Sequence, residues 1–301
     1  MTHPTTPLRI GTRSSPLAMA QARQVARALG QAELVPIVTR GDRTAGPLTQ
    51  IGGKGLFTGE LENALRQGRI DLAVHSAKDL PARLPPDMTI AAVPARQDAR
   101  DALVSPAGGD WAYLAARATL GTSSRRRVGQ ALHHRPDLRL LPLRGNVQTR
   151  LRKLQQGEFD AIILALAGLK RLDLLESLGS SVTPLEISSF VPAAGQGALA
   201  IEALTMNQAA CRAAAQLDHP DSSGALQAER QFVVQIGGDC QSPAGVHIMR
   251  QGGQWAGWAA AASPDGRRVL RSTARGERPG EVALALARDL LQQGVAGLLR
   301  G

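Results

Sequence analysis

The sequence feature that most constrains the fold is a short apolar segment followed at once by helix-starting residues, and it occurs twice. The first copy spans residues 8–16 (LRIGTRSSP), and apolar residues then recur at helical spacing until Gly30, at Ala18, Ala22, Val25 and Leu29. The second copy spans residues 118–132 (ATLGTSSRRRVGQAL) and repeats the Gly-Thr and Ser-Ser pairs of the first. Two similar strand-turn-helix units are therefore expected.

The same alternation continues through the first 200 residues. Further strands are expected at residues 34–38, 70–75, 139–143 and 159–166. A helix that carries Phe57, Leu61 and Leu65 is expected to end at Gly68, and another begins at Asn146. This order predicts two α/β lobes with mostly parallel sheets and covering helices.

Beyond about residue 218 the pattern changes to a smaller α+β domain. A helix is expected over residues 226–234, followed by short strands at 246–249, 255–262 and 269–272. A single helix over residues 281–299 is expected to close the chain.

The charge balance favours an anionic partner. Lys and Arg number 35 against 25 Asp and Glu, a formal charge of +10. Nucleic acid, acidic lipid headgroups and a small molecule with several carboxylates or phosphates all fit this balance. A GC-rich genome, which favours Arg codons, is an equally good explanation. Aromatic residues make up only 3% of the chain, too few for a base-stacking surface, and no nucleic-acid recognition motif occurs.

Neither a membrane nor a secretory pathway is indicated. The first residues are short and polar, unlike a signal peptide, and the apolar runs fall far below the roughly 18 residues that span a bilayer. The expectation is a cytoplasmic protein, in which the two cysteines are free or reactive. Cys211 falls in an Ala-rich helix and reads as a core residue, whereas Cys240 falls in a glycine-rich turn that would expose its sulfur.

Motifs for metals and nucleotides are missing from the sequence. It contains no CxxC, HExxH or histidine cluster, so no protein-built metal site is expected. It contains neither a GxxxxGK[ST] loop nor a GxGxxG that opens a helix, so nucleotide binding is unsupported.

Arginines follow three of the expected strand ends. These junctions gather backbone N–H groups and the positive end of a helix dipole, which favour anions. Ligands of open α/β sheets also lie beyond the strand C-termini. The three groups are Arg13 with Ser15, Arg126 and Arg127 with Ser124, and Arg144 with Gly145 and Arg150.

Two further segments suggest chemistry. In residues 74–81 (VHSAKDLP), Asp79 beside Lys78 at a strand end is expected to stay ionised and to suit a developing cation; a surface Lys-Asp pair is the alternative. Residues 41–55 hold five glycines around Lys54 and predict either a mobile lid or a plain surface connection.

A series of motifs runs in order along the chain: IGTRSSPLA (10–18), VTRGD (38–42), GGKGLF (52–57), VHSAKDLP (74–81), LGTSSRRR (120–127), LRGNVQTRL (143–151), AIILALAGLKRL (161–172), PAAGQGALAIE (192–202) and GGDCQSPAG (237–245). Taken in order, these motifs resemble the hydroxymethylbilane synthase (porphobilinogen deaminase) family along nearly the whole chain. The resemblance implies head-to-tail condensation of four porphobilinogen molecules with release of ammonia, giving the linear tetrapyrrole hydroxymethylbilane. It also implies two periplasmic-binding-protein-like lobes and a third domain, in a cytoplasmic monomer.

The resemblance further implies a domain division. The first lobe would comprise residues 1–96 plus 196–217, the second lobe residues 97–195, and the cofactor-carrying domain residues 218–301. Hinges would lie near residues 95–100 and 190–195.

The resemblance assigns roles residue by residue. Cys240 would carry a dipyrromethane cofactor through a thioether, and Asp79 would be the catalytic carboxylate that contacts pyrrole nitrogens. The cofactor's acetates and propionates would be held by Ser76, Lys78, Asp79, Ser124, Arg126, Arg127 and Gly145. Porphobilinogen and the growing chain would be bound by Arg13, Ser15, Arg144, Arg150 and Arg171, with Lys54 and Phe57 as loop positions of the site.

Four positions depart from the family's usual pattern. Gln148 replaces a frequent glycine, Gln50 a loop lysine, and Gly59 a lysine in the helix that it would interrupt; Asp239 adds a negative neighbour to Cys240. The strongest rival interpretation is a non-catalytic two-lobed protein that binds an anionic small molecule. Such a protein would need neither Cys240 nor Asp79.

Overall fold

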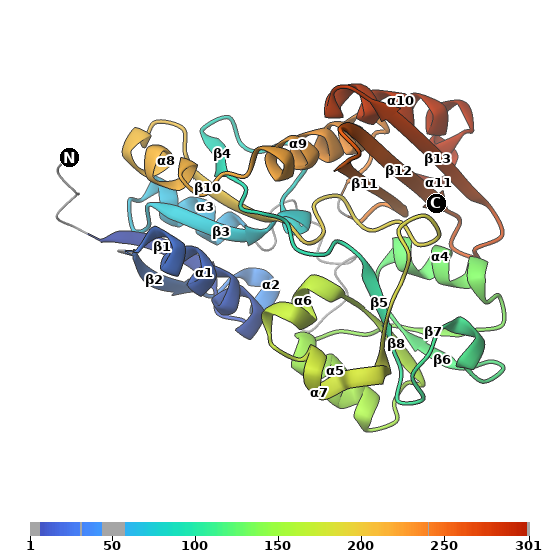
Figure 1. The fold of residues 1–301 in the computed structure, drawn as a ribbon. Helices are drawn as coiled ribbons and strands as arrows, with labels where there is room; N and C mark the ends of the chain where they lie inside the picture. The colour runs from blue at the N-terminus through green and yellow to red at the C-terminus, as the bar shows by residue number, and fades with distance from the viewer. Residues whose placement is uncertain (1–6, 31, 44–57, 240, 300–301) are drawn as a thin grey trace. The chain divides into compact units, whose positions relative to one another are not determined.

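The computed structural model describes residues 7–30, 32–43, 58–239 and 241–299. Its chain divides into two compact units (Figure 1). Unit 1 is Met1–Arg96 with Ala198–Ser223, and unit 2 is Gln97–Gly197 with Gly224–Gly301. Unit 2 contains two separate sheets, and the division into three domains stays a prediction.

Unit 1 is built on one five-stranded sheet of order β2-β1-β3-β10-β4. Its strands are β1 (Leu8–Arg13), β2 (Ala32–Ile37), β3 (Leu72–Ser76), β4 (Met88–Ala92) and β10 (Leu199–Leu204). Its helices are α1 (Pro16–Leu29), α2 (Arg40–Arg43), α3 (Gly59–Arg66), the short 3-10 helix η1 (Ala77–Asp79) and α8 (Gln208–Ala215).

The first sheet of unit 2 has the order β7-β6-β8-β5-β9. Its strands are β5 (Asp101–Val104), β6 (Thr119–Gly121), β7 (Arg139–Leu141), β8 (Ala161–Ala165) and β9 (Val182–Pro184). The accompanying helices are η2 (Trp111–Tyr113), α4 (Arg125–His134), α5 (Val147–Gln155), α6 (Leu166–Arg171), α7 (Leu175–Leu178) and η3 (Gly179–Ser181).

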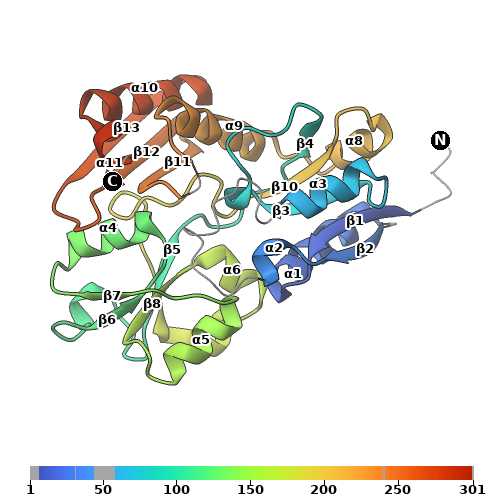
Figure 2. The same cartoon turned by 180° about the vertical axis from the view of Figure 1, so that it is seen from behind.

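The second sheet of unit 2 is an antiparallel meander covered by helices (Figure 2). It consists of β11 (Ala244–Gln251), β12 (Gln254–Ala262) and β13 (Val269–Gly276), with α9 (Pro220–Gln235), α10 (Pro279–Gln292) and α11 (Val295–Leu299). The single C-terminal helix expected over residues 281–299 is therefore wrong. Gly294, with a left-handed φ of +87°, separates α10 from α11, because a left-handed residue ends the helical ladder.

The α/β class with a smaller α+β part is confirmed, and the sheets add a feature that the alternation did not predict. In each five-stranded sheet two strand pairs are parallel, β1 with β2 and β3, and β6 with β7 and β8. The other pairs are antiparallel, because β10 enters beside β3 and β5 beside β8. Each sheet is thus half parallel and half antiparallel.

The repeated Gly-Thr pair has a packing reason. Gly11 and Gly121 both lie on the strand in second position of their sheets, β1 and β6. A Cβ on Gly11 would come within 2.3 Å of the Ile70 side chain, and one on Gly121 within 2.8 Å of the Phe159 ring. Since real Cβ atoms do not approach this closely, a side chain at either position would force these buried neighbours to move.

Local capping explains the helices that the sequence predicted. Ser15 accepts a hydrogen bond from the Ala18 N–H at 3.3 Å and starts α1, which ends at Gly30 with φ +82°. Ser124 caps α4 and Asn146 caps α5 in the same way. The sequence suggested that Gly59 interrupts a helix. Helix α3 instead begins at this residue.

Helix α4 also depends on a close approach. A Cβ on Gly129 would lie 2.6 Å from both the Ala262 Cβ and the Ser263 carbonyl oxygen at the end of β12. The helix that carries Arg126 and Arg127 therefore packs against the meander sheet with no room for a side chain at this point.

We expect Gly129→Ala to lower the free energy of unfolding by about 1–3 kcal/mol, the usual cost of overpacking, although alanine is the better helix former. Urea unfolding followed by circular dichroism measures this. The matched control is Gly59→Ala, where no described atom lies within 4 Å of the added Cβ; it should be neutral or stabilising. Equal stability of the Gly129→Ala variant and the parent would contradict the packing argument.

Candidate active site

A pocket of about 60 Å³ lies in unit 1 where β1 passes into α1 and β3 ends. It brings together four of the residues singled out from the sequence: Arg13, Ser15, Ser76 and Asp79. Its other lining residues are Leu17, Ala18, Gln21, Val74 and His75. The rule that ligands lie beyond the strand C-termini accounts for this meeting, since β1 and β3 are parallel neighbours.

Gln21, which sequence reasoning missed, fixes a polar group of this pocket. Its side chain is buried on α1, and its Nε2 donates a hydrogen bond to the Ser76 Oγ at 2.8 Å. The available signal was that Gln21 falls on the buried face of this amphipathic helix, together with Ala18 and Ala22.

The turn that carries Asp79 is held to the sheet by backbone contacts. The Ala77 N–H donates to the Ala198 carbonyl at 3.0 Å, and Leu199 is the strand partner of Ser76. Asp79 lies at the end of η1 with its side chain exposed. Lys78 belongs to the same turn and is not among the pocket's lining residues.

A second pair missed from the sequence lies inside the sheet of unit 1. The His75 Nε2 is 2.9 Å from the Glu202 Oε2, and the two side chains are only 3% and 0% exposed. The lone carboxylate in the apolar run of β10 was the signal. A buried carboxylate is stable only with partners. This contact therefore joins β10 to β3, the strand that precedes the turn carrying Asp79.

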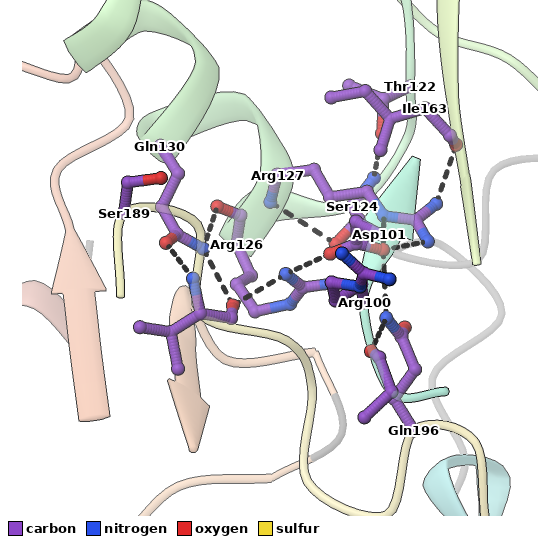
Figure 3. Close-up of polar contacts among 12 residues, drawn as sticks. Arg100, Asp101, Thr122, Ser124, Arg126, Arg127, Gln130, Ile163, Ser189 and Gln196 are labelled. Carbon is purple, nitrogen blue, oxygen red and sulfur yellow. Dashed lines mark hydrogen bonds and ion pairs between the residues drawn. The ribbon is translucent and has the colours of Figure 1, made fainter. Parts of the chain in front are cut away.

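In unit 2, Arg126 and Arg127 converge on one buried carboxylate, as Figure 3 shows. Asp101 is fully buried; its Oδ2 accepts from Arg126 Nη1 at 2.7 Å, and its Oδ1 accepts from Arg127 Nη2 at 2.6 Å. Gln196 Nε2 donates to the same Oδ1 at 3.0 Å. Backbone carbonyls complete the cluster, with Val191 accepting from Arg126 and Ile163 from Arg127.

The charges of this cluster do not cancel. Two guanidinium groups share one carboxylate, which leaves an excess positive charge. Burial lowers the pKa of Arg126, and the attraction of Asp101 opposes that shift. The guanidinium donors and the excess positive charge suit the binding of a further carboxylate. The cofactor acetates and propionates expected at Arg126 and Arg127 are therefore chemically compatible with their surroundings.

Three predicted residues lie together before and within α5. Arg150 Nε donates to the Gly145 carbonyl at 2.8 Å, and Asn146 caps the helix by accepting from the Thr149 N–H at 2.9 Å. Gly145 has a left-handed φ of +109°, and Arg144 precedes it. The structure thus places Arg144, Gly145 and Arg150 at one helix start.

Arg171 ends α6 and is partly buried. Its Nη2 donates to the Gly197 carbonyl at 2.7 Å, and its Nε is buried without a hydrogen-bond partner. Burial lowers the pKa of this guanidinium to about 10.

The predicted site residues Lys54, Phe57 and Cys240, and the loop position Gln50, lie outside the described residues. Beside Cys240, the Asp239 Oδ1 accepts from the Gln241 N–H at 2.9 Å. Cys211 packs against the core of unit 1, where burial raises the pKa of its thiol. Gln148 lies on α5 with an exposed side chain.

Two searches of the described ranges give negative results. In residues 7–30, 32–43, 58–239 and 241–299, no helix is long and apolar enough to cross a bilayer. Over the same ranges, no three His, Cys, Asp or Glu side chains are grouped so that they could hold a metal ion.

We expect Asp101→Ala to lower the free energy of unfolding of unit 2 by about 3–5 kcal/mol, because it leaves two buried guanidinium groups without their counter-charge. Urea unfolding monitored by tryptophan fluorescence measures this, since the tryptophans lie in unit 2. Asp265→Ala is the control, because the Asp265–Arg267 pair is exposed at the surface; its midpoint should stay near the parent's. A similar loss in both variants would refute the role of Asp101.

Comparison with known proteins bears on the identity of this site. The family model "Porphobilinogen deaminase, dipyromethane cofactor binding domain" matches residues 8–212. A porphobilinogen deaminase of Roseiflexus castenholzii is 46% identical over 98% of this chain and 99% of its own length. One from Acidithiobacillus ferrooxidans is 44% identical over 97% of both chains.

The solved structures give only remote likenesses. An arginine-specific periplasmic binding protein of Salmonella typhimurium has a TM-score of 0.39 at 12% identity, covering 75% of this chain and 98% of that one. An arginine transport periplasmic binding protein of Legionella pneumophila has a TM-score of 0.38 at 13% identity, covering 70% and 92%. The near full-length sequence matches, together with the ordered motifs around the pocket, show that this chain belongs to the porphobilinogen deaminase family.

Proposed function

We propose that Asp79 is the catalytic carboxylate of this hydroxymethylbilane synthase and that Cys240 carries its dipyrromethane cofactor. The reaction joins four porphobilinogen molecules head to tail, releases ammonia at each step and yields hydroxymethylbilane for tetrapyrrole biosynthesis. The observation that carries the assignment is the pocket in which Asp79 lies beside Arg13 and Ser15.

The pocket suits a small acidic pyrrole. Each porphobilinogen carries two carboxylates and a protonated amine. Arg13 offers a cation, and the start of α1 adds the positive end of a helix dipole. Residues of both charges thus line the pocket, and Asp79 suits the cationic part of the substrate.

Asp79 would act on the charge that develops during deamination. When the carbon–nitrogen bond breaks and ammonia leaves, positive charge remains delocalised over the pyrrole. A fixed carboxylate stabilises that charge more strongly once substrate displaces water from the pocket. The bond of Ala77 to Ala198 and the pairing of Ser76 with β10 hold the turn, so that Asp79 need not reorganise during the step.

The cofactor's carboxylates would be held by Ser76, Lys78, Asp79, Ser124, Arg126, Arg127 and Gly145. The excess positive charge around Asp101 supports this role. When bound, the cofactor supplies the pyrrole carbon to which the first substrate is joined. The growing chain would be bound by Arg13, Ser15, Arg144, Arg150 and Arg171.

We further propose that the protein is a cytoplasmic monomer whose partner is porphobilinogen rather than nucleic acid or a membrane. The rival, a binding protein that performs no chemistry, differs in a simple observable, because only the enzyme releases ammonia from porphobilinogen.

We expect Asp79→Asn to lower bilane formation by about a hundredfold to a thousandfold, because the amide keeps the shape of the side chain but removes its charge. Asp79→Glu keeps the charge one methylene further out and should retain measurable activity. Steady-state formation of bilane by the purified proteins measures both. If the amide turned over within a few-fold of the parent, the catalytic carboxylate would have to be sought elsewhere.

We expect the intact mass of the denatured protein to exceed the sequence mass by one covalent dipyrrole. Cys240→Ser should lack this addition because it lacks the sulfur that forms the thioether. Cys211→Ser should keep it, since Cys211 packs against the core of unit 1. An active parent protein of unmodified mass would disprove the thioether.

A further inference from the structure

One carbonyl group lies where the chain passes between the units. The boundaries of the units fall after Arg96, after Gly197 and after Ser223, and the first two meet at this carbonyl. The Gly197 carbonyl accepts two hydrogen bonds, from the Gln97 N–H at 3.2 Å and from Arg171 Nη2 at 2.7 Å. We call residues 97–99 and 195–197 the double crossing. Arg171 is thus bonded to the atom that joins its two segments.

The double crossing leaves little space. Gly197 has a left-handed φ of +85°, and a Cβ there would lie 2.4 Å from the Gln97 carbonyl oxygen. Gln196 Nε2 donates to the Ala99 carbonyl at 2.8 Å. A change at the Gly197 carbonyl therefore acts directly on both segments.

Arg171 has an unfilled donor. Its Nε is buried without a hydrogen-bond partner, and no carboxylate pairs with it among residues 7–30, 32–43, 58–239 and 241–299. The lowered pKa of this guanidinium has burial as its cause, with no anion to offset it. A buried cation in this condition gains from a carboxylate ligand.

Several arginines of this protein bind a carboxylate through one edge of the guanidinium, whereas Arg126 binds Asp101 through Nη1. Six arginines each bind a carboxylate with Nε and Nη2 together, in the pairs Arg9–Asp71, Arg66–Asp87, Arg100–Asp98, Arg127–Asp101, Arg135–Asp137 and Arg278–Glu281. In Arg171 the same edge has Nη2 on the Gly197 carbonyl and Nε empty. A carboxylate bound in the same way must therefore replace that carbonyl.

We propose that a substrate carboxylate binding to Arg171 releases the Gly197 carbonyl and so loosens the double crossing. This rests on the proposed function, in which Arg171 binds substrate. Because Nε is buried, the guanidinium must turn outward to present both donors, and that turn breaks its bond to Gly197. The ionised acceptor forms the stronger hydrogen bonds and drives the exchange. By linkage, a loosened crossing also favours carboxylate binding.

The test is hydrogen–deuterium exchange at the Gln97 amide of the holoenzyme, with and without excess porphobilinogen during turnover. In the parent protein, substrate should raise this exchange about fivefold, the effect of losing one ordinary hydrogen bond. Arg171→Gln should exchange faster without substrate and show no further rise. Arg171→Lys, which keeps the charge but has no paired donor edge, should also lack the substrate response.

Arg271→Gln is the matched control. Arg271 is also an arginine whose pKa is lowered by burial, and it donates to the Ser188 and Ser189 carbonyls, away from the double crossing. This variant should keep the response of the Gln97 amide. A parent protein that turns over without any change at Gln97, or a response that persists in both Arg171 variants, would overturn the proposal. A parent protein that consumes no porphobilinogen would instead contradict the proposed function.

Discussion

The arrangement of unit 2 depends on one buried carboxylate. Asp101 is fully removed from water, and such a charge persists only where strong donors surround it. Its donors come from two other parts of the chain, Arg126 and Arg127 on α4 and Gln196 near the unit boundary. Strand β5, helix α4 and the segment around Gln196 therefore cannot shift independently. The two arginines proposed to hold cofactor carboxylates have their positions set by the fold before a ligand is present, which is the condition for binding without reorganisation.

The buried carboxylates of this protein differ from Asp79 in what they contact. Glu229 resembles Asp101, since it is fully buried and accepts from the Gly195 N–H at 2.6 Å and the Ile248 N–H at 2.9 Å. Glu202 is buried against His75. Asp79 differs, because it is exposed at the end of a single helical turn. A carboxylate that stabilises the interior has its oxygens hydrogen-bonded to internal donors. One that must contact a substrate has to remain accessible. The exposure of Asp79 is therefore what a catalytic role requires.

The sequence predicted correctly the features that depend on residues close together in the chain, such as helix starts. Ser15, Ser124 and Asn146 start helices because their side chains satisfy nearby N–H groups, and this can be read from a few residues. The gathering of Arg13 and Asp79 followed from parallel strands that end at one edge. Strands β5 and β10 could not be found in this way, because their pairing partners β8 and β3 lie far away in the chain. Likewise the roles of Gln21 and Asp101 depend on partners 55 and 25 residues away.

The abundance of arginine had two explanations from composition, and the contacts add a third. Arg9, Arg66, Arg100 and Arg135 each hold a carboxylate of the same chain, so part of the positive charge supports the fold. Arg127 also has its Nε and Nη2 on Asp101. What an arginine can do for a ligand thus depends on whether this donor edge is already filled by a carboxylate, which the sequence does not reveal. Arg171 has only a neutral carbonyl on that edge. A neutral acceptor yields to an ionised one, so the same residue type acts as a fixed brace at one position and as an exchangeable contact at another.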